Sequence, residues 1–288
     1  MALQQRTRLL ESFAAHAVLI VAVAFALYPV LWVVALAFSG VSEPAPRVIP
    51  VPIEPTLEHL REVVGSTQVV GGETRWLFGL QLANSLIVSL ATALVGVGIA
   101  IPTAYALARF DFVGKRGGVK LLLATQMFPA VASAIPLYIL LDWLSLLNSR
   151  TGLVLCYATT AVPFAIFQLR GAFETIPEDL EEAAMVDGAT RFQAFIRVVL
   201  PAARPAIAVT ALFAFMSAYN EFILAATILG KEEALTLPVV LQRFVGEHDA
   251  AWGSFAAGSI VVSLPVMVLF YVVQRHLVSG LTAGGVKG

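Results

Sequence analysis

The sequence predicts an all-α membrane protein with six transmembrane helices, and three observations support this fold class. Apolar residues make up 59% of the 288 residues and charged residues only 13%, whereas an average soluble domain is about 25% charged. The mean hydropathy is +0.85. Six stretches also approach the length of about 20 mostly apolar residues that a spanning helix needs. They are His16–Phe38, Asn84–Leu107, Val119–Leu144, Gly152–Leu169, Ile207–Ile228 and Phe255–Gln274.

The first stretch has two features of a secretory signal peptide. Arg6 and Arg8 precede it, and the sequence ALA at 35–37 resembles a cleavage site. Its apolar run exceeds 20 residues, however, and the apolar region of a signal peptide has only about 7–15. We therefore expect an uncleaved transmembrane helix.

The positions of lysine and arginine predict the orientation in the membrane. With the N-terminus in the cytoplasm, 12 of the 18 basic residues fall in cytoplasmic segments, as the positive-inside rule requires. We therefore expect both termini in the cytoplasm. The predicted parts are a cytoplasmic N-terminus (1–15), a six-span domain (16–278) with outer loops 39–83 and 229–254 and an inner loop 170–205, and a cytoplasmic tail (279–288).

The segments outside the spans differ in composition. Prolines in 43–55 favour extended backbone over a packed helix. The outer loop 229–254 mixes apolar and charged residues, so it could fold locally or contact a partner. The glycine-rich tail 279–288 is expected to be extended.

Catalytic and metal-binding motifs are missing from the sequence. It contains no phosphate-binding G-x-x-x-x-G-K-[ST] loop and no His, Cys or Asp cluster with the spacing of metal ligands. The lone cysteine, Cys156, lies in an apolar run and cannot form an internal disulfide. The net charge of −1 gives no general attraction to nucleic acid. We expect a non-enzymatic chain that binds no cofactor itself.

The inner loop contains a pattern typical of a short helix. Pro177 suits a first helical turn, and the acids at 178–182 lie where the helix dipole favours negative charge. Gly188 is expected to end this helix in the left-handed conformation that glycine adopts without steric cost. Ala183 and Ala184 would allow another surface to approach closely.

A second, amphipathic helix is predicted directly after the glycine. Thr190 and Gln193 have the spacing of a capping box. Apolar residues follow at helical spacing and predict one apolar stripe, formed by Phe192, Phe195, Ile196 and Val199. Pro201 and Pro205 end the pattern. By spacing alone, the hairpin is either a docking element or a solvated loop on the bilayer surface.

The hairpin residues resemble the EAA motif of binding-protein-dependent ABC importer permeases. The matching positions are Glu182, Ala183, Ala184, Asp187, Gly188, Ile196, Leu200 and Pro201. The resemblance implies a type I ABC importer permease fold in the bacterial inner membrane. It also implies that this segment is a coupling helix, which sits in a cleft of the ATP-hydrolysing subunit and transmits its closure to the spans.

Further segments are similar to the smaller permease subunit of maltose/maltodextrin importers. They are 125–144, 235–259 and the end of the tail at 280–288. The resemblance implies that Gly284, Gly285 and Lys287 reach toward the nucleotide-binding dimer, and that the 229–254 loop enters the sugar site of a binding protein. The first span and residues 39–83 match less distinctively.

The resemblance implies a set of partners and a function. A second homologous permease would complete the pathway, two ATP-binding subunits would use ATP and Mg²⁺, and a periplasmic or lipid-anchored sugar-binding protein would deliver the sugar. Alternating access would then import maltose or maltodextrin. Trehalose and other oligosaccharides stay open as substrates.

Three polar residues in the fifth predicted span are candidates for a pathway lining or a polar contact between permease subunits. They are Tyr219, Asn220 and Glu221, and polar groups in hydrocarbon need a partner or a water cavity. The alternative is a single structural hydrogen bond or a position near the outer interface. Glu221 also leaves open an ion-coupled secondary transporter. A membrane enzyme or anchor is a further alternative, although no catalytic residues cluster.

Five prolines in the predicted spans are expected to kink or interrupt the helices. They are Pro102, Pro129, Pro136, Pro163 and Pro265.

Overall fold

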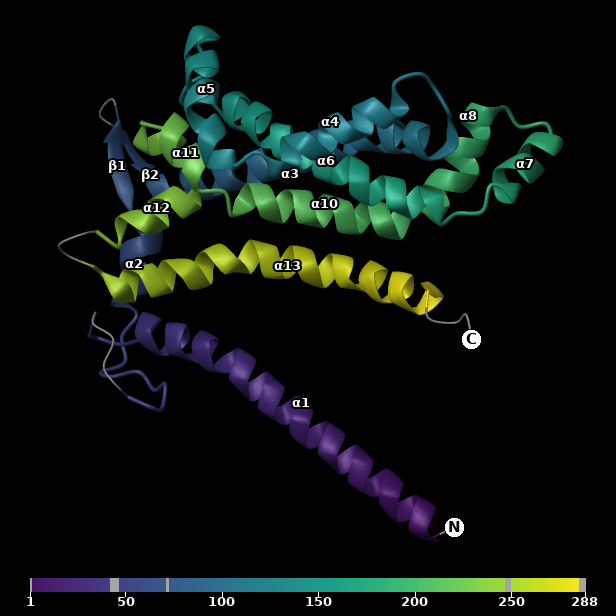
Figure 1. Cartoon of the computed structure of the whole chain (residues 1–288). Coiled ribbons are helices and arrows are strands. Elements are labelled where there is room, and N and C mark those ends of the chain that lie inside the picture. Colours follow the sequence, from purple (N-terminus) through teal and green to yellow (C-terminus); the bar gives the residue numbers. More distant parts are fainter. Residues whose placement is uncertain (1, 42–46, 71–72, 247–249, 285–288) are drawn as a thin grey trace. The chain divides into compact units, whose positions relative to one another are not determined.

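The computed structural model describes residues 2–41, 47–70, 73–246 and 250–284, and these are mostly helical (Figure 1). They form two compact units, one drawn from residues 1–78 and 241–263 and the other from 79–240 and 264–288. The longest helices are α1 (Ala2–Ala37), α3 (Leu77–Arg109), α6 (Arg150–Glu174) and α13 (Trp252–Gly284). Within the described residues, these four are long and apolar enough to cross a membrane, and the number is up to six if each of two bent helix pairs forms one span.

The third predicted span is broken rather than continuous. It consists of α4 (Lys115–Met127) and α5 (Ala130–Trp143), which meet at an angle of 100°. Phe128 lies at the break with extended dihedral angles (φ −78°, ψ 128°), because the ring of Pro129 disfavours the helical conformation of the residue before it. The other four prolines that were expected to kink or interrupt spans lie inside helices, and so does Pro29 of the first predicted span.

The fifth predicted span, Ile207–Ile228, is also interrupted. Its first part is α10 (Arg204–Tyr219), and α11 (Ile223–Ile228) follows after a gap of three residues. The Glu221 side chain lies in this gap and accepts hydrogen bonds from the backbone N–H groups of Leu224 and Ala225 at the start of α11, and such local bonds compete with a continuous helix. The bent pair that includes α10 joins it to Arg191–Ala202 at 71°.

Shorter elements lie between the long helices. The first unit contains α2 (Glu58–Val64) and an antiparallel hairpin of β1 (Thr67–Val70) and β2 (Glu73–Trp76), with Thr67 opposite Trp76. The remaining elements are α7 (Asp179–Val186), α8 (Arg191–Ala194), the π-helix η1 (Phe195–Val199), α9 (Leu200–Ala202), the 3₁₀ turn η2 (Glu232–Ala234) and α12 (Leu237–Arg243). In the proline-rich segment, residues 47–55 are non-helical, as predicted.

The start of the predicted tail is helical, so the expectation of an extended segment is wrong for residues 279–284, which continue α13. Only Gly280 and Gly284 are glycines in this stretch. A glycine inside a helix lowers stability by roughly 0.5–1 kcal/mol relative to alanine. This cost is small enough for the long apolar helix before it to continue through the glycine.

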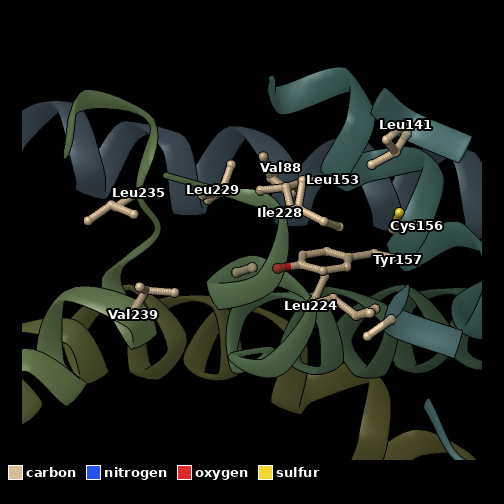
Figure 2. Close-up of a cluster of buried hydrophobic side chains, with 13 residues drawn as sticks. Val88, Leu141, Leu153, Cys156, Tyr157, Leu224, Ile228, Leu229, Leu235 and Val239 are labelled. Atoms are coloured by element: carbon tan, nitrogen blue, oxygen red, sulfur yellow. The ribbon is translucent and has the colours of Figure 1, made fainter. Parts of the chain in front are cut away.

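Among the described residues of the second unit, buried apolar side chains gather in two clusters. Figure 2 shows the first, where Leu141 of α5, Leu153 and Tyr157 of α6, and Leu224 and Ile228 of α11 meet. Cys156 is also buried in it, as expected.

The second cluster joins the ends of α3 and α6 to η1 through Leu107, Phe173 and Val199. Helix α10 packs along α6 between the two clusters (Figure 1). The hairpin that follows α6 is therefore attached to a packed end of the helix bundle.

Candidate functional site

Helix α7 has the start and end that its sequence predicts. Asp179, Glu181 and Glu182 lie in its first turn, and Pro177 lies just before it. Gly188 has a φ of +91°. The N–H of Gly188 bonds the carbonyl of Met185 at 3.0 Å, and the N–H of Ala189 bonds that of Ala184 at 3.0 Å, which is the Schellman pattern of helix termination.

The second helix has the predicted capping box. The Thr190 hydroxyl accepts from the N–H of Gln193 at 3.2 Å, and the Gln193 side chain accepts from the N–H of Thr190 at 2.9 Å. The predicted single apolar stripe is wrong. Phe195 packs on the core with Val199, whereas Phe192 and Ile196 are 70% and 43% exposed. The helix becomes a π-helix at Phe195, and its wider turn ends the i, i+3, i+4 register.

The outer face of α7 is open to solvent in this chain. Glu182, Ala183 and Asp187 are exposed, and Ala184 is half-buried. The side chain of Val186 is 88% exposed. The sequence pattern indicated the acidic and small residues of this helix and did not identify this exposed apolar side chain. Leu200 and Pro201, at the other end of the hairpin, are half-buried. The exposed face thus combines acids with small and apolar side chains, a composition suited to contact with another protein.

The inner face of α7 is fixed by a buried ion pair that the sequence did not indicate. Glu181 Oε1 lies 2.6 Å from Arg109 Nε, and both side chains are less than 10% exposed. The hydroxyl of Tyr105 donates to Glu181 Oε2 at 2.6 Å. Arg109 also donates to the carbonyl of Ile176 at 2.7 Å and lies 3.8 Å from Glu178. Both carboxylate oxygens of Glu181 are therefore occupied by groups at the end of α3.

Aromatic rings extend this anchor to the neighbouring helices. The Tyr105 ring lies 4.3 Å from the Phe195 ring and 6.1 Å from the Phe173 ring. The guanidinium of Arg191 lies 5.1 Å above the Phe110 ring, a cation–π contact. The hairpin is thus attached to α3, α6 and the turn before α4. Movement of α7 relative to α3 would break contacts that are buried.

The three polar candidates of the fifth span do not form one site. Tyr219 is buried and stacks on Phe215, with ring centroids 5.4 Å apart. The carboxylate of Glu221 accepts from Leu224 N at 3.0 Å and Ala225 N at 3.2 Å, so this acid has a structural role at the start of α11. Asn220 is exposed and bonds the Met216 carbonyl at 2.9 Å.

Asn220 lines a cavity of about 300 Å³ between α6 and α10. Thr160 and Ser217 add hydroxyl groups to it, and Phe164 and Phe213 add aromatic walls. Aromatic walls with a few polar groups are typical of small-molecule sites. Of the three candidates, Asn220 has the surroundings expected of a pathway residue.

The segment from Gly230 to Leu237, in the predicted outer loop, is bound to the start of α3. Asn84 Nδ2 donates to the carbonyls of Glu233 at 2.8 Å and Leu235 at 3.0 Å. Gln81 donates to Glu232 O at 3.2 Å, and the Ser85 hydroxyl accepts from Leu237 N at 2.8 Å. Asn148 Oδ1 accepts from Gly230 N at 2.6 Å and Lys231 N at 3.0 Å. The backbone of most of this segment is therefore held by hydrogen bonds to side chains of α3 that lie about 150 residues away in the sequence.

Gly284 is the last residue of α13. Gly285 and Lys287, the other predicted tail contacts, lie outside the described residues. Among the side chains that the structure describes, no group of three His, Cys, Asp or Glu residues is placed to hold a metal ion.

Comparison with known proteins gives consistent matches. Residues 96–282 match the family model for the inner membrane component of binding-protein-dependent transport systems. The chain is 36% identical over 268 residues to the trehalose transport system permease protein SugB of Mycobacterium tuberculosis (strain CDC 1551 / Oshkosh), covering 92% of this chain and 94% of SugB. It is 36% identical over 294 residues to the maltose/maltodextrin transport system permease protein MalG of Yersinia pestis, covering 99% and 95%.

A solved structure also matches over almost the whole chain. It is a chain of a bacterial ABC transporter involved in the import of the acidic polysaccharide alginate. The TM-score is 0.73 at 26% identity, and the match covers 94% of this chain and 97% of that chain.

Proposed function

Because the chain belongs to the family of inner membrane components of binding-protein-dependent transport systems, we propose that it forms half of the sugar pathway of an ATP-driven importer. It is a permease subunit and not an enzyme. In this proposal a second homologous permease completes the pathway, and a periplasmic or lipid-anchored binding protein delivers the sugar. Two ATP-binding subunits use ATP and Mg²⁺, and this chain holds no cofactor.

One observation supports a coupling role for α7 most directly. Its inner acid, Glu181, is bonded to α3 through Arg109 and Tyr105, while its outer residues Glu182 and Val186 are exposed. A helix with one face fixed to a span and the other face free can transmit movement from a bound subunit. Closure of the ATPase subunits then moves α7 and α3 together and opens the pathway outward.

The proposed orientation places both termini and α7 in the cytoplasm. The excess of basic residues in the segments on that side supports it. The tail residues Gly284, Gly285 and Lys287 then extend α13 toward the ATP-binding subunits.

For the substrate we propose maltose or maltodextrin, with another oligosaccharide such as trehalose as the alternative. The relatives named for these sugars are equally identical to the chain, at 36%, so identity does not separate them. The cavity beside Asn220 offers amide, hydroxyl and aromatic groups that suit a sugar's hydroxyls and ring faces. The binding protein and the second permease are expected to determine most of the selectivity.

The test is co-expression of this chain with the neighbouring permease, ATPase and binding-protein genes. The complex is purified through a tag on this chain, and ATP hydrolysis is measured with the binding protein and maltose, maltotriose or trehalose. Stimulation by one loaded binding protein supports the importer and identifies the sugar. Stimulation by none of the three sugars contradicts the substrate proposal, and failure of any ATPase subunit to co-purify contradicts the coupling role of α7.

A further inference from the structure

A basic cavity of the second unit lies at the turn between α3 and α4. Its volume is about 630 Å³. Four cationic side chains line it, and the lining includes one carboxylate, that of Asp111. The cations are Lys115, Arg116 and Lys120 from α4 and Arg170 from α6. Two different helices therefore bring positive charge to one hollow.

The four cationic side chains differ in their hydrogen bonds and ion pairs. Lys115 Nζ donates to the carbonyl of Phe110 at 2.9 Å and to Asp111 at 3.1 Å. Arg170 pairs with Glu174 at 2.7 Å. No described residue forms an ion pair with Arg116 or Lys120, and both are exposed. The cavity thus holds two cations available to a bound anion.

The cavity also has an apolar side. Phe112 and Val119 line it beside the cations, and Phe112 is 50% exposed. Along α4, the apolar side chains of Leu121 and Leu123 are 69% and 48% exposed. A free inorganic anion would gain nothing from these residues, whereas a lipid with an anionic headgroup would use both parts.

The turn between α3 and α4, which lines the cavity, lies at the same end of the second unit as α7 and α8 (Figure 1). Lys115 of the cavity donates to the carbonyl of Phe110. The ring of Phe110 in turn contacts Arg191 of α8 and the ring of Tyr105, whose hydroxyl binds Glu181. An anion bound at the cavity would therefore sit next to the anchor of α7.

We propose that this cavity binds the phosphate of an anionic membrane lipid, with Arg116 and Lys120 as the main phosphate contacts and the apolar side chains of α4 along the acyl chains. Basic pockets between membrane helices are suited to anionic headgroups. The site is separate from the sugar pathway and from the outer face of α7.

The test measures lipid binding to the chain purified from membranes with the subunits that accompany it. The protein is placed in nanodiscs of phosphatidylcholine with or without phosphatidylglycerol, and retained phosphatidylglycerol is counted by native mass spectrometry. For the double variant Arg116→Gln with Lys120→Gln, we expect roughly thirtyfold weaker retention, the effect of two basic groups acting on an anionic lipid.

Two controls make the result specific. Arg61→Gln with Arg75→Gln removes the same charge at exposed positions of the other unit and should retain the lipid. Arg116→Lys with Lys120→Arg keeps the charge and should also retain it, which separates lost binding from misfolding. Equal phosphatidylglycerol retention by the wild type and the Gln variant overturns the proposal.

Inorganic phosphate distinguishes the two sources of the anion. Added to protein in phosphatidylglycerol nanodiscs, it should leave the bound lipid in place. If phosphate displaces the lipid, or binds equally well in phosphatidylcholine alone, the site is one for free phosphate and the assignment to a lipid is wrong.

Discussion

The carboxylate of Glu181 and the guanidinium of Arg109 form a buried ion pair at 2.6 Å across 72 residues of sequence. Arg109 is the last residue of α3, and Glu181 lies on the inner face of α7. The buried contacts between this membrane helix and the hairpin proposed to contact the ATPase therefore centre on this ion pair and on the tyrosine hydroxyl that binds the same carboxylate.

Removing one partner of this pair should destabilise the complex strongly. Arg109→Ala leaves a carboxylate buried without its cation, which typically costs about 3–5 kcal/mol. The matched control is Arg170→Ala, because Arg170 pairs with Glu174 at a similar distance of 2.7 Å but with side chains 28% and 45% exposed. That exposed pair should contribute about 0–1 kcal/mol.

Thermal unfolding of the purified complex compares the two variants. We expect a clear drop in Tm for Arg109→Ala and little change for Arg170→Ala. Equal shifts would show that burial of the Glu181 pair has no energetic effect.

Substitution of Gly188 should act through the backbone alone. Its φ of +91° is unfavourable for other residues by about 1–2 kcal/mol, and a Cβ there would meet no atom within 4 Å. Gly188→Val should therefore lower transport or complex stability, and Gly188→Asn should do so less, because asparagine tolerates this conformation.

Gly171→Ala is the control for the glycine variants. Gly171 lies inside α6 with similar open space, and alanine in a helix should be neutral or stabilising by roughly 0.5–1 kcal/mol. Transport assays and thermal unfolding of all three variants check this order. Unchanged transport in Gly188→Val would refute the requirement for a left-handed residue.

Reversal of the charge at Glu182 should weaken ATPase binding without unfolding the chain. Glu182 is exposed, so it can pair with a basic residue of a partner, and loss of a charged hydrogen bond should weaken binding about tenfold or more. Co-purification of the ATPase with Glu182→Lys measures this. Asp142→Lys, at an exposed position of α5, should co-purify normally, and equal recovery for both variants would count against the contact.

Transport by the Glu221→Gln variant should still be driven by ATP hydrolysis, because Glu221 is not expected to carry a coupled proton. The glutamate accepts two backbone hydrogen bonds at the start of α11, and glutamine keeps one acceptor oxygen, so we expect a loss of about 1 kcal/mol, as for a weakened helix cap. Uptake should stop when ATP is depleted and should continue when only the proton gradient is collapsed. The reverse pattern would favour a secondary transporter.

Local sequence patterns predicted the parts of the site that depend on neighbouring residues. The glycine end of α7 and the capping box at Thr190 involve residues within five positions of each other. The proline break of the third span was visible as Pro129, although the 100° angle was not.

Contacts between distant residues could not be read from the sequence. Glu181 and Glu182 are adjacent acids, and only the position of Arg109 makes one an anchor and leaves the other exposed. The packing of the Phe195 ring against Tyr105 and Phe173, at the start of the π-helix, likewise involves residues that are distant in the sequence. Glu221 was a candidate because it is an acid in a predicted span, and its bonds to the backbone N–H groups of Leu224 and Ala225 depend on the break between α10 and α11.

The side chains of Asn84, Ser85 and Asn148 fix the backbone from Gly230 to Leu237 before any partner arrives. Ordering a residue costs roughly 1–2 kcal/mol of conformational entropy. For this segment that cost is met during folding of the permease, so a docking protein does not have to meet it. The binding affinity of a partner at this surface should then depend mainly on the side chains that contact it. The entropy cost of ordering the loop should contribute little.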